Sequence, residues 1–482
     1  MRRNLLAAAS GIGGDARMSL ASKTVSSRLP DIVGAAHVIN DPAQLAFYEV
    51  DGKKPGAAVR PGSREEIAEI VKFAAAENLA VVPAGARTKL GIGLPPAQYD
   101  VALDMTRLDR VIAYDPADLT LAVEAGHSLS KLLGVLGDHR QFLPLLVPYF
   151  SRTTVGGTIA SAVDSPLRQY YGTARDYVLG MEYVTGEGVL AKSGGRVVKN
   201  VSGYDMHKLL IGSLGTLGVI VSVNFKTFPS ALGSRGFVAM FENAEGAVEM
   251  RHRTARSALT PITMEIFSPR VAELFSSEVA ARIGSGAMPP NLLSAKHWAF
   301  TSGYTGNEKV LARYEADYRQ MAEELGAVNA TVLDDKTRPP AFSRKREFIS
   351  ILLASSPAAT IMKISVLPAR MKEVLAEAQR AAENYSLEWA VMARGIGVIY
   401  LALLPRERDE QSRARVANAT NEILAAAAKL EGHGTIPWAP SEWKSALKIW
   451  GLERGDFAQM QKVKKVFDPR GIMAPGRFVG GL

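Results

Sequence analysis

The stretch KNVSGYDMHKLLIGSLGTLGVIVSVNFKTFP, residues 199–229, decides how the fold of this chain is interpreted. Its glycines Gly212, Gly215 and Gly218 recur at every third position, immediately before the apolar run VIVSV. Taken alone, this spacing indicates a tight turn that leads into a β-strand. Glycine at such positions permits the close approach of a ligand or of a neighbouring backbone, because it has no Cβ.

Two other glycine-containing loops follow predicted strands. VVPAGARTKLGIG (81–93) combines small residues with polar and basic side chains, which suits phosphate but equally suits a basic surface turn. SRTTVGGTIASAVDSP (151–166) is consistent with a helix whose free N–H groups face an anion, or with a close helix contact. Neither loop has the G-x-G-x-x-G pattern of nicotinamide-binding Rossmann folds or the pattern of a P-loop.

The composition predicts an ordinary globular protein of two or three domains. The 482 residues are 47% hydrophobic and 22% charged, with a formal net charge of +9. No dense basic segment with interleaved aromatic residues occurs, so we do not expect a nucleic-acid partner. The absence of cysteine excludes disulfides, thiolate catalysis, iron–sulfur ligation and a cysteinyl flavin link within this chain.

The sequence gives no sign of a membrane-spanning segment, since no apolar run reaches the roughly 20 residues that a membrane helix needs. Residues 1–30 are interpreted as a disordered tail or a misannotated start, with Met18 as the alternative first residue. We therefore expect a cytoplasmic protein, with membrane contact that is at most peripheral and made through partners.

From residue 55 the chain alternates short β-like runs with helices, a pattern typical of α+β folds. SREEIAEIVKFAAAENL (63–79) predicts a helix with Ser63 as its N-cap. Residues 231–431 predict one antiparallel sheet with helices on one face. Within them, RPPAFSRKREF (338–348) is interpreted as a solvated face rather than as a carboxylate or partner site. Its basic residues are Arg338, Arg344, Lys345 and Arg346.

Six motifs stand in a characteristic order along the chain. They are VVPAGARTKLGIG, VIAYDPADLTLAVEAGHSLSKL, TTVGGTIAS, YYGTARDYVLGMEYVTGEG, KNVSGYDMHKLLIGSLGTLGVI and FDPRGIMAPGRF. In this order and spacing they resemble the vanillyl-alcohol-oxidase/PCMH family of flavoproteins. Within that family, residues 194–220 look most like the FAD-binding subunits of glycolate oxidases.

The resemblance implies a domain organisation. A PCMH-type FAD-binding domain of two subdomains would span residues 31–230, and a cap or substrate domain would span 231–431. Residues 432–482 would form a C-terminal segment that returns to the FAD-binding domain.

The resemblance also assigns residues to the cofactor. It implies that the FAD pyrophosphate lies against the first two loops, and the adenine and ribose against the third. The implied FAD-binding residues are Pro83, Ala84, Gly85, Ala86, Arg87, Thr88, Lys89, Gly156, Gly157, Thr158, Ser161, Arg175, Asp176, Gly215, Thr216, Gly218, Ile220 and Arg477. Ala84 and Ala86 depart from the glycine pairs common in the family's first loop. Noncovalent FAD is expected, because the chain has no cysteine and this loop has no histidine.

Oxidation of a 2-hydroxy acid by a flavin needs a cation for the carboxylate and an acceptor for the hydroxyl proton. The candidate catalytic residues are Lys199, Tyr204 and His433. Each also has a plain interpretation, as a solvated cation, a packed aromatic ring and a structural histidine respectively. No metal site is expected, because this chain lacks the richer His/Asp motif of metal-using relatives of the family.

The resemblance implies an FAD-binding subunit of a glycolate or other 2-hydroxy-acid oxidase (dehydrogenase) complex. Its implied partners are a small 2-hydroxy-acid substrate, a second flavin subunit and an iron–sulfur subunit. Two alternatives stay open. One is a self-sufficient FAD-dependent oxidase or dehydrogenase of another alcohol or hydroxy acid, and the other is a structural subunit with a vestigial flavin site.

Overall fold

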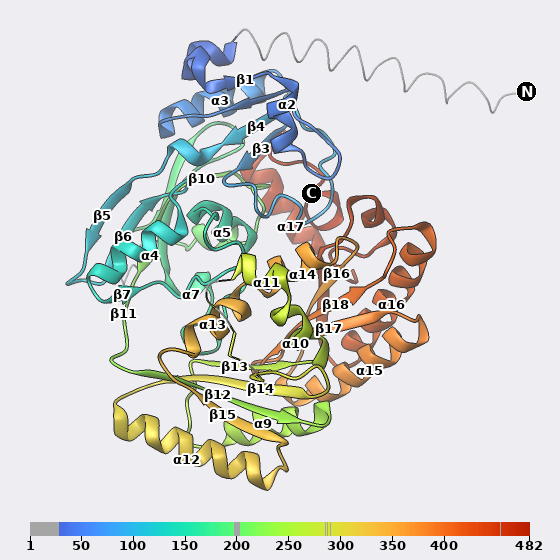
Figure 1. Cartoon of the computed structure of the whole chain (residues 1–482). Helices are drawn as coiled ribbons and strands as arrows, with labels where there is room; N and C mark the ends of the chain where they lie inside the picture. Colours follow the sequence, from blue (N-terminus) through green and yellow to red (C-terminus); the bar gives the residue numbers. More distant parts are fainter. Residues whose placement is uncertain (1–27, 197–202, 285, 287, 290, 454) are drawn as a thin grey trace, which may run out of the picture.

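The computed structural model describes residues 28–196, 203–284, 286, 288–289, 291–453 and 455–482 (Figure 1). An N-terminal domain is built on two main sheets, and a cap domain is built on one large sheet. The predicted α+β class, with a two-part first domain and an antiparallel cap sheet, is confirmed. Of the predicted tail at 1–30, residues 1–27 lie outside the described residues.

The first sheet of the N-terminal domain has four short strands. Their order is β1 (Val38–Ile39), β2 (Ala57–Val59), β4 (Val101–Asp104) and β3 (Val81–Ala84), with the last three parallel. Helix α3 (Arg64–Ala76) connects β2 to β3 and packs its apolar side in the core of this sheet. It begins where the sequence predicts, because the Ser63 hydroxyl accepts a hydrogen bond from the Glu66 N–H at 3.1 Å.

The second sheet of the N-terminal domain is antiparallel. Its strands are, in order, β5 (Val111–Asp115), β6 (Thr120–Glu124), β10 (Val219–Lys226), β8 (Val178–Val184) and β9 (Leu190–Gly194). The apolar run that follows Gly218 is the central strand β10. Helices α4 (Leu129–Asp138) and α5 (Val155–Ser161) pack on the apolar face of this sheet, so α5 lies directly beneath β10 and β6.

The cap domain contains a sheet of eight strands in which every neighbouring pair is antiparallel. Their order is β15 (Asn329–Leu333), β12 (Ser234–Phe241), β14 (Trp298–Thr305), β13 (Thr263–Phe267), β17 (Glu388–Arg394), β18 (Val398–Leu404), β16 (Thr360–Ser365) and β19 (His433–Trp438). Since β19 pairs with β16, the cap sheet continues past residue 431, where the sequence analysis ended the domain.

Helices cover both faces of the cap sheet, whereas the sequence predicted helices on one face only (Figure 1). The predicted helices form the outer face: α9 (Ala244–Arg256), α12 (Glu308–Glu324), α15 (Met371–Asn384) and α16 (Glu410–Lys429). The inner face carries helices that the sequence pattern did not indicate: α10 (Pro269–Ser276), α11 (Glu278–Ile283), α13 (Arg338–Arg346) and α14 (Phe348–Ser355). These helices are short, with six to nine residues each, and α14 is apolar almost all round, so α14 lacks the amphipathic period that reveals a surface helix.

The interpretation of Arg344 and Lys345 as solvated was wrong. Both side chains are buried in α13, and the Lys345 ammonium lies 2.5 Å from a carboxylate oxygen of Glu265. Arg394 on β17 lies 3.5 Å from the other oxygen of the same carboxylate. Four of the nine residues of α13 are buried, and cations on this buried side need buried partners.

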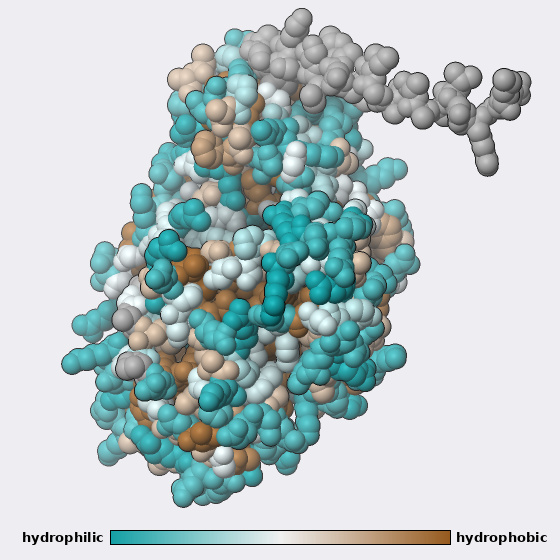
Figure 2. Space-filling view, turned by 45° about the vertical axis from the view of Figure 1, so that its right-hand side comes forward, coloured by the Kyte–Doolittle hydropathy of each residue, from teal (hydrophilic) through white to brown (hydrophobic). Residues whose placement is uncertain are grey.

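The C-terminal segment contacts the N-terminal domain. After α17 (Phe457–Phe467), the backbone of Val81 accepts from the Ala474 N–H at 2.8 Å and donates to the Ile472 carbonyl at 2.9 Å. The segment thereby extends the first sheet beside β3. Figure 2 shows hydrophobic surface gathered near the middle of one face, with hydrophilic side chains around it. Among the described residues, no helix combines the length and the apolar character that crossing a membrane requires.

Candidate active site

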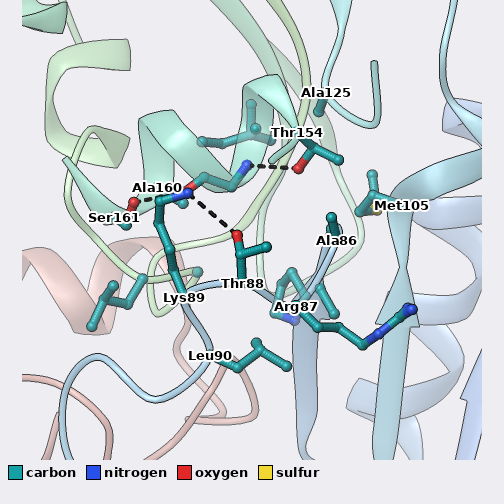
Figure 3. A pocket seen from close by; sticks show the side chains of 18 of the residues that line it. Ala86, Arg87, Thr88, Lys89, Leu90, Met105, Ala125, Thr154, Ala160 and Ser161 are labelled. Atoms are coloured by element: carbon teal, nitrogen blue, oxygen red, sulfur yellow. Dashed lines mark hydrogen bonds between the residues drawn. The ribbon is translucent and has the colours of Figure 1, made fainter. Parts of the chain in front are cut away.

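A cleft of about 720 Å³ lies in the N-terminal domain where three segments meet (Figure 3). They are the loop after β3, helix α5 and the turn before β10, and the returning C-terminal segment adds one arginine. The cleft brings together most of the residues that the sequence singled out. These lining residues are Pro83, Ala84, Gly85, Ala86, Arg87, Thr88, Lys89, Gly156, Gly157, Ser161, Gly215, Gly218, Ile220 and Arg477.

The loop after β3 presents its backbone to the cleft. Within the described part of the chain, the N–H groups of Ala86, Arg87, Thr88 and Lys89 donate no hydrogen bond to the protein. Arg87 has a φ of 61°, in the left-handed region, which bends the loop at that point. Successive N–H groups in such a bend form a concave array of donors suited to an anion.

The two cations of this loop point in different directions (Figure 3). The Arg87 guanidinium turns toward Asp104, donating to its carboxylate at 3.1 Å, and lies over the Tyr48 ring. The Lys89 side chain turns toward α5 and donates to the Thr153 hydroxyl at 2.5 Å. Lys89 is buried and lines the cleft, so it is the cation placed to meet an anion there.

Helix α5 contributes shape rather than free N–H groups. The sequence analysis raised the possibility that these groups would face an anion, but the first three have protein acceptors. The N–H groups of Val155 and Gly156 donate to backbone carbonyls at 2.9 and 2.7 Å, and that of Gly157 donates to the Thr154 hydroxyl at 3.3 Å. A Cβ at Gly156 would lie 2.7 Å from the Ala125 Cβ, whereas one at Gly157 would meet only the Thr154 hydroxyl at 3.0 Å. Gly156 therefore allows close packing, and Gly157 keeps the cleft open.

In the turn before β10, Gly215 and Gly218 lie so close to neighbouring atoms that a side chain at either position would crowd them. Gly215 has a φ of 78°, and a Cβ there would lie 3.1 Å from the Pro83 ring. A Cβ at Gly218 would lie 2.5 Å from the Val184 carbonyl oxygen. The glycine spacing that opened the sequence analysis thus brings this turn against the loop after β3, and both glycines line the cleft.

Three cations of the C-terminal segment, two of them buried and Lys464 partly buried, hold the cleft loops in place. The Arg477 guanidinium donates to the carbonyls of Leu90 and Ile92, the latter at 2.7 Å. The Lys444 ammonium donates to the carbonyls of residues 91 and 93 at 2.6 and 2.9 Å, and the Lys464 ammonium donates to the carbonyl of residue 216 at 2.7 Å. Arg477 therefore positions the first loop, in addition to lining the cleft.

A second cavity, which we call the chamber, lies between the cleft and the cap domain. Its volume is about 730 Å³, and Ser161 and Leu214 line both the cleft and the chamber. Among the described residues, four aromatic side chains line it, from Tyr400, Trp438, Trp450 and Phe478. The cap sheet contributes Lys363 from β16 and Tyr400 from β18, which are paired neighbours on its inner face.

A cluster of charged groups surrounds Lys363. Its ammonium lies 2.8 Å from an oxygen of Asp164, to which the Tyr400 hydroxyl also approaches at 3.4 Å. The Arg168 guanidinium contacts both oxygens of the same carboxylate, at 3.0 and 2.9 Å. Burial alone would raise the pKa of Asp164, but Lys363 and Arg168 together lower it. Burial alone would lower the pKa of Lys363, but Tyr400 and Asp164 together raise it. Both groups are therefore charged around neutral pH.

Four residues implied to contact the cofactor do not line the cleft. The hydroxyls of Thr158 and Thr216 are buried and donate to backbone carbonyls at 2.9 and 2.7 Å. The Asp176 carboxylate caps the short helix α7 (Ala174–Tyr177), accepting from the Thr173 N–H at 2.6 Å. Arg175 lines a separate cavity on the far side of Lys363.

Two of the three candidate catalytic residues, Tyr204 and His433, are not brought to the cleft or the chamber. Lys199 lies outside the described residues. Tyr204 is 90% exposed, and His433 is an exposed residue at the start of β19, beside Ser365 of β16. In the described part of the chain, no group of three His, Cys, Asp or Glu side chains is arranged to hold a metal ion.

Comparison with protein families identifies the cofactor of the chain. A family model described as "FAD binding domain" matches residues 55–194, and one described as "FAD linked oxidases, C-terminal domain" matches residues 234–436 and 450–478. The chain belongs to the FAD-linked oxidase family of PCMH type. FAD is therefore its cofactor, and the prediction of an FAD-dependent oxidoreductase is confirmed.

Several members of the family are similar over nearly their whole length. The glycolate oxidase subunit GlcD of Bacillus subtilis is 24% identical, with 95% of this chain and 97% of that protein covered. A D-2-hydroxyglutarate dehydrogenase of Xanthomonas citri pv. viticola is 26% identical, with coverage of 93% and 95%. A D-lactate dehydrogenase of Archaeoglobus fulgidus is 26% identical, with coverage of 88% and 91%.

Solved structures share the fold. A p-cresol methylhydroxylase structure matches with a TM-score of 0.74 at 17% identity, covering 96% of each chain. An alkyldihydroxyacetonephosphate synthase structure matches with a TM-score of 0.70 at 17% identity, covering 92% of this chain and 84% of that one. The PCMH fold predicted from the six motifs is thereby confirmed.

The residues of the cleft fit FAD. The unpaired N–H groups of residues 86–89 and the buried ammonium of Lys89 match the two negative charges of a pyrophosphate. Gly157 lines the cleft without a side chain, and a Cβ there would already lie 3.0 Å from the Thr154 hydroxyl, so a side chain and a bound ligand would compete for the same space. Apolar atoms of Met105 and Ile220 line the same cleft and suit the flat faces of a ring. The alanines of the first loop, Ala84 and Ala86, also line this cleft.

We expect FAD affinity to fall as the pH rises above neutral. Burial lowers the pKa of Lys89 to about 7, a change that the nearby Glu347 carboxylate partly offsets. A bound pyrophosphate would raise that pKa again, so FAD binding takes up a proton wherever free Lys89 is neutral. The affinity is then highest below pH 7 and falls by up to about tenfold per pH unit above it. FAD titrations of the apoprotein, followed by fluorescence quenching, measure this slope.

The Lys89→Met variant is the matched comparison for this prediction. It should bind FAD more weakly at low pH and show a flat affinity across the same pH range, because methionine fills the site without titrating. An equal pH slope in the variant and the parent protein would contradict the assignment of Lys89 as the pyrophosphate cation.

Proposed function

We propose that this protein oxidises a small 2-hydroxy acid, passing two electrons from the substrate's CH–OH group to FAD. The observation that carries the proposal is the charged cluster at Lys363, which lies in the chamber adjoining the FAD cleft. The relatives reported above support it, because their names specify glycolate, D-lactate and D-2-hydroxyglutarate. All three compounds carry a carboxylate beside a hydroxyl-bearing carbon.

FAD supplies the two-electron redox chemistry when it is bound. In this proposal, Lys363 binds the substrate carboxylate through a charge-assisted hydrogen bond. Tyr400, whose pKa is raised by burial, is protonated and donates to Asp164, so its oxygen accepts a hydrogen bond from the substrate hydroxyl. The proton that this hydroxyl loses on oxidation passes through Tyr400 to the Asp164 carboxylate. Asp164 holds both side chains in place through the contacts described above. These residues replace Tyr204 and His433 as our candidates, because they line the chamber and the other two do not.

In this proposal, the aromatic side chains that line the chamber exclude water from the substrate. Trp438 is buried, and the rings of Trp450 and Phe478 lie with their centroids 4.7 Å apart. Low local polarity strengthens the attraction between Lys363 and a carboxylate. We propose that the FAD is held noncovalently, because no cysteine or histidine occurs among the described residues that line the cleft and the chamber.

We further propose that the chain works as the FAD-binding subunit of a larger complex, with a second flavin subunit and an iron–sulfur subunit. One support is the name of the Bacillus relative, which designates a subunit. The other is that the chain has no cysteine, so iron–sulfur ligands would have to come from another chain. Any membrane association would then be peripheral and made through those partners.

A turnover assay with a panel of acids tests the proposed activity. The purified protein is loaded with FAD and supplied with an artificial electron acceptor and glycolate, D-lactate, L-lactate or D-2-hydroxyglutarate. At least one 2-hydroxy acid should support turnover, while propionate and glutarate, which lack the hydroxyl, should not. Failure of all the hydroxy acids with FAD retained would contradict the proposal.

Affinity purification of the tagged chain from its own cells tests the subunit role. Co-purification of a second flavoprotein and of a protein with iron–sulfur absorbance would support it. A chain that purifies alone and turns over at full rate would favour the self-sufficient enzyme instead. A chain that purifies alone and binds no FAD would favour the structural role.

A further inference from the structure

A third cavity, which we call the outer cavity, adjoins the chamber on the side away from the FAD cleft. Its volume is about 620 Å³. Ala162, Val163 and Lys363 line both cavities, so the two meet at these residues. Arg175, an exposed side chain, lines the outer cavity but not the chamber. The outer cavity therefore runs between solvent and the residue that we assign to the substrate carboxylate.

The charges of the outer cavity favour an anion. Of the described residues that line it, three are cations, Arg168, Arg175 and Lys363, and one is a carboxylate, Asp164. A guanidinium nitrogen of Arg175 donates to the carbonyl of Lys208 at 2.7 Å, which fixes the position of the side chain. Among the described residues, no carboxylate lies within salt-bridge distance of Arg175. A cavity with an excess of one charge concentrates ligands of the opposite charge.

The ion pair of Lys363 and Asp164 stands where the two cavities meet. Asp164 has a second cation, since Arg168 contacts both of its oxygens. Lys363 can therefore exchange this carboxylate for that of an incoming ligand without leaving Asp164 unpaired. Leaving a buried carboxylate unpaired would cost free energy and oppose such an exchange. Because Arg168 stays paired with Asp164, this penalty does not arise.

We propose that the outer cavity is the route by which the anionic substrate reaches the chamber, with Arg175 as the residue that attracts it and Lys363 as the residue that receives it. The inference rests on the proposed function, because it assumes that the substrate is a carboxylate bound at Lys363. It adds a direction of access and a positioning role for Arg175, which the resemblance had placed beside the cofactor.

The association rate of a carboxylate probe tests this route without turnover. Oxalate resembles a 2-hydroxy acid but has no C–H bond to oxidise, and its binding in the chamber should perturb the absorbance of the nearby flavin. Stopped-flow mixing of oxalate with the FAD-loaded protein, at several ionic strengths, gives the association rate constant and its salt dependence.

We expect the Arg175→Gln variant to bind oxalate about three- to tenfold more slowly at low ionic strength, and Arg175→Glu to bind it more slowly still. Both differences should shrink as salt is added, since salt screens exposed charges. The matched control is Arg256→Gln, which removes an exposed arginine from α9 on the outer face of the cap sheet. It should leave the rate unchanged.

The outcomes separate this route from the proposed function. Arg175 variants with the association rate and salt dependence of the parent protein would overturn the route, even if 2-hydroxy acids are turned over. An effect that is equal at all ionic strengths would also overturn it, because it would indicate a structural change rather than the loss of attraction. Slower, salt-sensitive oxalate binding without turnover of any 2-hydroxy acid would support the route and contradict the proposed function.

Discussion

The Gly157→Val variant is expected to fold normally and to lose FAD. Gly157 stands in the first turn of α5 and lines the cleft, and a Cβ there meets no atom closer than the Thr154 hydroxyl at 3.0 Å. The two methyl groups of valine would therefore extend into the space that the cofactor needs. We expect the dissociation constant for FAD to rise about 100-fold or more, because small shape errors at a closely packed ligand cost several kcal/mol.

Gly134→Val is the matched control for this prediction. Gly134 lies within helix α4, and nothing lies within 4 Å of the position of its Cβ. In both variants the exchange of glycine for valine changes helix propensity by the same small amount, below about 1 kcal/mol and in favour of valine, so their melting temperatures as apoproteins should be similar. Retention of FAD by folded Gly157→Val at the level of the control would contradict the position of the cofactor in this cleft.

The Lys363→Met variant is expected to keep FAD and lose most of its activity. Methionine fills a similar volume but removes the ammonium that contacts Asp164 at 2.8 Å. Loss of a charge-assisted hydrogen bond to a carboxylate substrate costs about 3 kcal/mol, so kcat/KM should fall about 100-fold or more. Asp164 keeps its contacts with Arg168, so the fold should survive. Steady-state kinetics with the best acid of the panel, together with the FAD content, measure both effects.

Two further variants make the result specific to Lys363. Lys363→Arg should recover part of the activity, since arginine restores the charge with a different shape. Lys372→Met removes an exposed lysine of α15, which forms an ion pair with Glu245, and should have no effect on kcat/KM. Activity in Lys363→Met equal to that of Lys372→Met would show that the carboxylate binds elsewhere.

The cleft was more accessible to sequence reasoning than the chamber, and the difference has a physical cause. The cleft is built from short contiguous loops. Its glycines and the basic side chains of the loop at 81–93 therefore form local patterns that can be recognised in the sequence. The chamber depends on side chains from strands that only tertiary pairing brings together, such as Lys363 and Tyr400. A lysine within the otherwise apolar strand ATIMKIS was a signal that was available and not used.

Sequence reasoning also misjudged where charge is buried. Arg344 and Lys345 were interpreted as solvated because basic residues are usually exposed, whereas α13 lies between the cap sheet and neighbouring helices. Similarly, the role of Lys444 depends on contacts with carbonyls of Gly91 and Gly93, which are more than 350 residues away in the sequence. Such contacts leave no periodic pattern, so only the folded chain reveals them.

Anaerobic mixing of the FAD-loaded protein with a 2-hydroxy acid tests the central claim most directly. The claim is that this one chain holds FAD in the cleft and delivers electrons to it from a carboxylate substrate bound at Lys363. With glycolate, D-lactate or D-2-hydroxyglutarate, the visible absorbance of the oxidised flavin should bleach in a single turnover, and it should do so far more slowly in Lys363→Met. A protein that retains FAD and is bleached by none of these acids, while dithionite reduces it fully, would contradict the account.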